Sequence, residues 1–191
     1  MPTTDTPPGR AANLGPAAAA RNRTALLTAA RAVFAESGID APLAAIAKRA
    51  GVGQGSLYRH FPDRVALAVA VFEDNVAELE LLAADPRSTL RDLLTKITQQ
   101  IVDSTAFVDL VRAANTDDRV ASLAARVEAV IDARVRYGQA DGTVPGDRTA
   151  SDLMLSVTMV SAAVSADAPV TTLRLLALRA WRLLGVDLTE R

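Results

Sequence analysis

The sequence predicts an all-α fold of about nine helices. Ala, Leu, Val, Arg, Asp and Glu dominate the 191 residues, whereas Phe, Trp and Tyr together account for only 4%. This composition favours helix over strand. Apolar residues recur at spacings of three and four along most of the chain, and Gly or Pro separates the periodic stretches. That pattern indicates successive amphipathic helices, and no strand-like alternation competes with it.

The first two helices are predicted from one apolar stripe each. Helix one begins between residues 17 and 21 and ends at Ser37, where Gly38 supplies a suitable C-terminal residue. Helix two is expected after Asp40, a good N-cap, with Pro42 tolerated in its first turn.

The next two helices meet at a proline. Gly51 ends helix two because a tight turn there requires a positive φ. Helix three covers roughly 54–60, with Leu57 and Phe61 assigned to the core. Pro62 stops it, and a long helix follows over about 63–84.

Five further helices are expected after Asp85-Pro86. They cover about 88–104 (capped by Ser88), 106–114, 117–139, 148–166 and 170–184. The stretch 153–166 is almost free of charge but is too short to cross roughly 30 Å of hydrocarbon, so it predicts a buried helix.

The composition excludes several kinds of site. The chain contains no cysteine and a single histidine, His60, which excludes disulfides, Cys-ligated metals and polyhistidine sites. We therefore expect neither a metal nor a cofactor. The adjacent acids Asp117-Asp118 and Glu73-Asp74 offer little for catalysis, because neighbours on a helix do not face each other. A helical enzyme that uses carboxylates stays a remote alternative.

Charge is distributed unevenly along the chain. Residues 9–64 contain eight Lys or Arg and three acids, a local charge of +5, whereas residues 65–191 have a local charge of −5. This is the distribution expected of a nucleic-acid-binding unit fused to an acidic partner domain. Residues 1–20 are expected to be a disordered tail without signal-peptide features, which favours a cytoplasmic protein.

The segment Leu43–Arg64, LAAIAKRAGVGQGSLYRHFPDR, predicts a helix-turn-helix that enters the DNA major groove. Two short helices flank a glycine-containing turn. Gly51, Gly53 and Gly55 also spell GxGxG, but no strand precedes them, so a nucleotide-binding loop is excluded.

This segment, together with AARAVFAESGID before it, resembles the DNA-binding domain of the TetR family of bacterial transcriptional regulators. The family run is approximately IA-x-x-AGVS-x-GTLY-x-HF-x-x-K. The matching residues are Ile46, Ala47, Ala50, Gly51, Val52, Gly55, Leu57, Tyr58, His60, Phe61 and Arg64. The resemblance covers about residues 21–67. Three positions depart from the family pattern. Gly53 and Ala41-Pro42 remove hydroxyls that would cap a helix or meet a phosphate, whereas Ser56 only replaces a common Thr.

The DNA-contacting residues follow from this comparison and from side-chain chemistry. Arg59 can read guanine or contact a phosphate, and Gln54 can pair with adenine. Gly55 permits close approach of the backbone. The full set expected to contact DNA is Arg23, Lys48, Gln54, Gly55, Ser56, Tyr58, Arg59, His60 and Arg64. Core packing is the alternative for Tyr58 and His60, whereas Arg64 is the foremost candidate for a phosphate contact.

The resemblance also implies the remaining organisation. It implies a helix-turn-helix domain over 21–66 and a helical ligand-binding and dimerisation domain over 67–191, with a homodimer formed through helices near 148–166 and 170–184. The resemblance further implies an unknown small molecule that releases the protein from a near-palindromic operator. The sequence pattern offers as its binding residues the polar interruptions Arg112 and Thr158 and the bulky Phe107 and Met154. A constitutive DNA-binding or adaptor protein without an effector is the main alternative.

Overall fold

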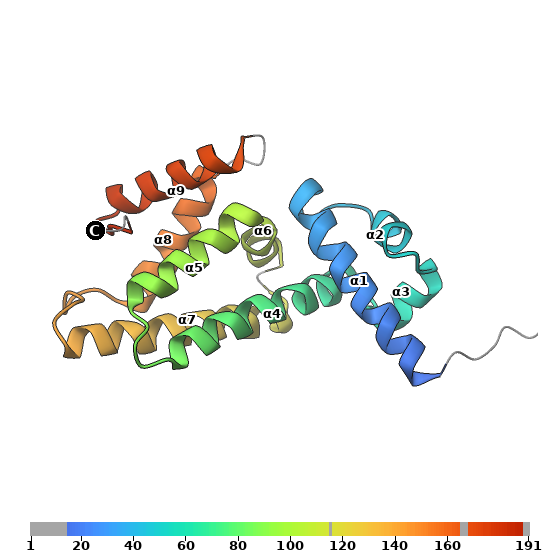
Figure 1. The fold of residues 1–191 in the computed structure, drawn as a ribbon, viewed down its shortest axis with the longest axis horizontal. Coiled ribbons are helices and arrows are strands. Elements are labelled where there is room, and N and C mark those ends of the chain that lie inside the picture. Colours follow the sequence, from blue (N-terminus) through green and yellow to red (C-terminus); the bar gives the residue numbers. More distant parts are fainter. Residues whose placement is uncertain (1–14, 115, 165–167, 189–191) are drawn as a thin grey trace, which may run out of the picture.

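The computed structural model describes residues 15–114, 116–164 and 168–188, and this part of the chain contains nine α-helices and no strand. The expected all-α fold is therefore confirmed (Figure 1). The helices are α1 (Pro16–Ser37), α2 (Leu43–Ala50), α3 (Gln54–His60), α4 (Arg64–Ala84), α5 (Leu90–Asp103), α6 (Ala106–Ala113), α7 (Asp118–Ala140), α8 (Ala150–Ala163) and α9 (Val170–Leu183).

The first three helices form a small unit at one end of the molecule (Figure 1). Its core is built from the apolar stripe of α1 and from residues that anchor the two shorter helices. Leu26, Phe34, Ile46, Leu57 and Phe61 are all almost completely buried there. The assignment of Leu57 and Phe61 to the core is confirmed.

The long helix α4 connects this unit to the rest of the protein. Its first half packs on α1, where the Arg31 guanidinium donates to the Val71 carbonyl and to the Asp74 carboxylate. Its whole length lies beside α7, which runs in the same direction (Figure 1). Arg126 of α7 bridges Glu73 and Glu80, two turns apart on α4.

Helices α5, α8 and α9 complete the larger unit. The Trp181 side chain of α9 is fully buried, and its indole Nε1 donates to Thr98 Oγ1 of α5 at 2.7 Å. This bond satisfies the indole N–H in an apolar core, while the Thr98 hydroxyl also donates to the Leu94 carbonyl at 2.6 Å.

Several helix starts differ from those expected. Helix α1 begins at Pro16, so residues 16–20 belong to it and not to a tail, because Pro suits the first turn and Ala is the best helix former. Residues 1–14 lie outside the described part. Pro42, not Asp40, is the N-cap of α2, because Pro42 still has extended backbone.

The caps of α5 and α8 also correct the prediction. Thr89, and not Ser88, caps α5 in a capping box with Asp92. Thr149 does the same for α8 with Asp152, so that helix starts later than residue 148. In each case the threonine hydroxyl accepts from the backbone N–H three residues on, and the aspartate reaches back.

Within the described residues, no helix is long and apolar enough to cross a membrane.

Candidate nucleic-acid interface and ligand cavity

The turn between α2 and α3 places one face of α3 at the surface. Gly51 adopts the left-handed conformation, with φ 65° and ψ 26°, and its N–H bonds back to the end of α2. Leu57 then points into the core, which turns the opposite face of α3 outward. Gly53 caps α3 without any side-chain hydrogen bond, as the missing hydroxyl predicts.

The outward face of α3 contains most of the expected DNA-contacting residues. Gln54, Gly55, Tyr58 and Arg59 are exposed. Tyr58 is 52% exposed, so core packing does not account for it. Ser56 is half-buried on the same helix. His60 is also half-buried, with its ring 6.2 Å from the Phe61 ring.

The Lys and Arg side chains of this unit differ in their partners. Arg49 donates to Glu36 at 2.5 Å, and this hydrogen bond lowers the pKa of the Glu36 carboxyl. Arg23 lies over the buried Phe61 ring, with its guanidinium carbon 4.8 Å from the centroid. Among the described residues, Lys48 and Arg59 form no ion pair, which leaves both charges available to phosphate.

Arg64 has a structural partner that the sequence did not indicate. Its Nη1 donates to the carbonyls of Ile39, at 2.6 Å, and Ala41. The side chain therefore ties the start of α4 to the loop before α2. No sequence signal predicts this contact, because the partners lie more than 20 residues away.

The chain is similar to known proteins in both sequence and fold. Residues 26–71 match the family model described as "Bacterial regulatory proteins, tetR family". A TetR transcriptional regulator from Streptomyces coelicolor is 30% identical in sequence, with a TM-score of 0.61 over 88% of this chain and 99% of that chain. This chain belongs to the TetR family.

Two further relatives are consistent with this assignment. The HTH-type transcriptional regulator AcrR of Shigella flexneri is 34% identical over 93 residues, but the match spans only 44% of this chain and 43% of AcrR. The structure of Salmonella enterica GusR is 25% identical, with a TM-score of 0.57 over 84% of this chain and 95% of that chain. The TetR-family chain is thus a DNA-binding transcriptional regulator with a helix-turn-helix, and its family is not an enzyme family.

The larger unit of this TetR-family regulator contains a narrow, mostly apolar cavity of about 70 Å³, called here the apolar cavity. Helices α4 to α8 all contribute to it. Its lining residues are Phe72, Asn75, Val76, Leu79, Ile97, Gln100, Ile101, Ser104, Val108, Val111, Val127, Met154, Val157 and Thr158. Asn75, Gln100, Ser104 and Thr158 are the polar groups among them.

Two of the four residues expected to bind an effector lie at the apolar cavity, namely Met154 and Thr158. Arg112 does not: it is exposed on α6 and pairs with Asp109 one turn earlier, at 3.6 Å. The side chain of Phe107 lies outside the described part. The α4 residues were missed because Phe72, Val76 and Leu79 read as ordinary members of an apolar stripe.

A salt bridge also connects the two units of this regulator. Asp63, the residue before α4, accepts from Arg119 near the start of α7, with both guanidinium nitrogens 3.2 Å from Oδ2. The other oxygen, Oδ1, caps α4 by accepting from the Ala66 N–H at 2.6 Å. Arg119 additionally pairs with Asp117 at 2.7 Å.

Proposed function

We propose that this TetR-family regulator is a repressor that binds a near-palindromic operator as a homodimer and is released by a mostly apolar small molecule. One observation carries the proposal: α4 belongs to both units. Its middle residues Phe72, Val76 and Leu79 line the apolar cavity, and its first residue, Arg64, bonds the loop before α2. A ligand that displaces α4 would therefore displace the DNA-binding unit.

On the DNA side, α3 is proposed as the recognition helix. Arg59 presents a guanidinium that suits the bidentate pairing with guanine, and Lys48 supplies charge from α2. Arg23, Tyr58, His60 and Arg64 are proposed as phosphate contacts, and Gln54, Gly55 and Ser56 as the approach to the bases. The proposed DNA-binding domain is 21–66, and 67–191 is the proposed ligand-binding and dimerisation domain.

A dimer interface is supported by exposed apolar side chains on the last two helices. Leu155 and Met159 are exposed on α8, and Val170, Leu175, Leu176 and Leu183 are exposed on α9. Other α8 residues, including Val157 and Val160, pack inside the same chain. Several large apolar side chains exposed on two neighbouring helices are expected at an interaction site, and a symmetric dimer would place two α3 helices roughly 34 Å apart for successive major grooves.

The small size of the apolar cavity means that binding of an effector would require helix movement. At about 70 Å³ it is far smaller than the roughly 300 Å³ or more of a typical small-molecule site. An effector must therefore move the surrounding helices to enter. It favours release only to the extent that it binds this expanded state better than the DNA-bound state.

Capture of genomic fragments by the purified protein tests DNA recognition. We expect selective retention of a near-palindromic sequence and a steep loss of affinity with salt, because phosphate contacts release counterions. The proposal fails if no fragment survives competitor DNA at moderate salt.

A compound screen by thermal shift, followed by DNA-binding measurements, tests the effector. A ligand of the native state raises the melting temperature, and here it should also weaken operator binding. Val108→Phe, which fills the apolar cavity, should retain operator binding but lose the response. Val69→Phe, at a half-buried position of α4 outside that cavity, is the matched control and should retain it. A compound that binds without affecting the operator complex would favour a constitutive DNA-binding protein.

A further inference from the structure

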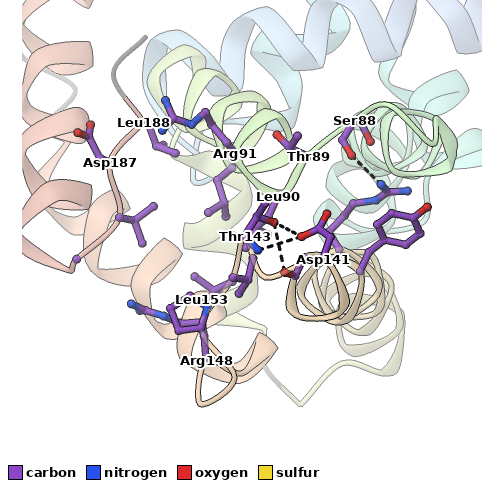
Figure 2. Close-up of a pocket in the computed structure, with 18 of the residues that line it drawn as sticks. Ser88, Thr89, Leu90, Arg91, Asp141, Thr143, Arg148, Leu153, Asp187 and Leu188 are labelled. Carbon is purple, nitrogen blue, oxygen red and sulfur yellow. Dashed lines mark hydrogen bonds between the residues drawn. The ribbon is translucent and has the colours of Figure 1, made fainter. Parts of the chain in front are cut away.

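A second cavity, of about 710 Å³, lies at the end of the larger unit that is remote from α3 (Figure 2). We call it the distal cavity. It is open to solvent on one side and is lined by residues around the start of α5, by the end of α7 with the loop that follows it, and by residues 185–188 after α9. It shares no lining residue with the apolar cavity.

One wall of the distal cavity contains a buried arginine whose hydrogen bonding is incomplete. Arg134 is only 8% exposed. Its Nη1 donates to the Ser88 carbonyl at 2.7 Å (Figure 2), and its Nη2 donates to the Ala83 carbonyl. Its Nε is buried without a hydrogen-bond partner. Such an orphaned donor is rare in native proteins, so the hydrogen bonding of this guanidinium is left incomplete within the described residues.

The charge of Arg134 is also uncompensated by any direct ion pair within the described part of the chain. The nearby Asp85 is already occupied, since its pKa is lowered chiefly by hydrogen bonds from Arg87 and only to a smaller extent by the charge of Arg134. The Tyr137 ring lies 5.3 Å from the guanidinium carbon and covers one face of it. Buried charges are normally paired, so an anion is the partner that the site lacks.

The rest of the lining has the same charge preference. Arg87, Arg91 and Arg148 line the cavity together with Arg134, whereas Asp141 and Asp187 are the acids of the lining. Asp141 is satisfied locally, because Thr143 donates to it from both its N–H and its hydroxyl. The lining therefore contains four arginines and two acids, and the charge of Arg87 is already offset by Asp85 beside the cavity.

The remaining walls are apolar. Leu90, Leu94, Val144, Leu153, Val186 and Leu188 all contribute side chains. Bare phosphate would leave this surface without a partner. The volume, the buried guanidinium and the apolar walls together fit a molecule with one anionic group and a hydrocarbon body.

We propose that the distal cavity binds a small organic carboxylate, with its anionic group attracted by the charges of Arg134 and Arg148, which both line the cavity, and its hydrocarbon part against the apolar walls. This site is separate from the proposed effector cavity, so DNA recognition and release through the apolar cavity stand or fall independently of it.

Isothermal titration calorimetry of the full chain at physiological salt tests the proposal, with 4-phenylbutanoate as the probe. Saturable binding is expected, whereas the neutral analogue 4-phenylbutan-1-ol should bind at least about tenfold more weakly because it cannot form charge-assisted hydrogen bonds. Inorganic phosphate should compete poorly. Equal affinity for acid and alcohol, equal affinity for phosphate, or no binding of the acid would each overturn the proposal.

Variants locate the site. Arg134→Gln and Arg148→Gln should each weaken binding of 4-phenylbutanoate, by about tenfold for the buried arginine. Arg136→Gln is the matched control, since it removes the same charge from α7 at an exposed side chain outside the lining, and it should leave binding unchanged. If Arg134→Gln does not fold, the affinities of Arg148→Gln and Arg136→Gln for 4-phenylbutanoate still test the site, because Arg148 lines it and Arg136 does not. Equal losses in these two variants would indicate a general charge effect and refute the site.

Discussion

Asp63 and Arg119 join the start of α4 to the start of α7, 56 residues further along the chain. Both residues lie where the helices that line the apolar cavity meet the DNA-binding unit. Asp63 directly precedes the helix that ties down the DNA-binding unit, and Arg119 belongs to the helix that borders the apolar cavity through Val127.

We expect Asp63→Asn and Arg119→Gln to loosen this connection equally. Each removes the salt bridge, while the amide oxygen of Asn can still cap α4. Amide hydrogen exchange in the first turn of α4 should accelerate in both, because local opening becomes easier. The double variant should show no further increase, since the two residues act as one unit. Additive effects would show that they do not. Arg136→Gln, on the same helix but paired only within it, serves as the control.

Acid titration should reveal the cap of α7. Hydrogen bonds from Arg119 lower the pKa of Asp117 from its ordinary 3.8 to about 2. Because the pKa is lower in the folded state, ionised Asp117 stabilises the fold above about pH 4, and this contribution is lost as the pH falls toward 2. Carboxyl NMR should show a midpoint near 2, and Asp117→Asn should remove the associated pH dependence of stability. A midpoint near 3.8 would contradict the arrangement.

The substitution Gly55→Ala should have opposite effects on stability and on DNA affinity. The space beside its Cα is open, since a methyl group attached there would have no neighbouring atom within 4 Å. Gly55→Ala should therefore leave stability unchanged or raise it by up to about 1 kcal/mol, because Ala is the better helix former. It should weaken operator binding if the backbone approaches DNA there. Thermal unfolding and fluorescence anisotropy measure the two effects. Gly146→Ala, in an equally open loop, is the control, and unchanged affinity for Gly55→Ala would refute a close approach.

Arg64 is expected to act both as a positioning residue and as a phosphate contact. Arg64→Ala should weaken binding to every sequence and reduce the salt slope by about one phosphate. It should also destabilise the fold by roughly 1–3 kcal/mol, since the carbonyls of Ile39 and Ala41 lose a charged donor. Arg64→Lys retains the charge but not the fork, so it should preserve the salt slope while losing stability. Denaturant unfolding and binding across a salt series separate the two roles. A loss confined to one base pair would disprove the phosphate contact, and unchanged stability of Arg64→Ala would disprove the positioning role.

A charge on the outer face of α9 should break the proposed dimer. Leu175→Glu places a carboxylate at a side chain that is 69% exposed in the single chain. If this side chain is buried between two copies, the variant should become monomeric by light scattering, because a buried unpaired charge is costly. Leu81→Glu is matched in chemistry and exposure, at 75%, but lies on α4. It should stay dimeric, and two variants with the same mass would argue against this interface.

Local sequence signals predicted the local structure well. The burial of Leu57 and Phe61 and the turn at Gly51 could be predicted, because both depend only on residues within one or two helical turns. Helix starts were less predictable. Asp40 and Ser88 are residue types that often cap helices, but Pro42 and Thr89 are the residues at the N-cap positions.

Contacts between distant segments were beyond the sequence. The bonds of Arg64 to the loop before α2, the Asp63–Arg119 salt bridge and the burial of Arg134 depend on how helices rotate against one another. Arginine is usually exposed, so nothing in the periodicity distinguishes Arg134 from its exposed neighbour Arg136. The lining of the apolar cavity was only partly predicted for the same reason, because residues that line a cavity and residues that fill a core share one apolar pattern.

The buried indole of Trp181 has a practical consequence. It is the only tryptophan of the chain, so all indole fluorescence comes from the contact between α9 and Thr98 of α5. Trp181 therefore reports on the contact between α9, a helix of the proposed dimer interface, and α5, which borders both cavities. Its emission wavelength and quenching would follow subunit association and ligand entry in the unlabelled wild-type protein.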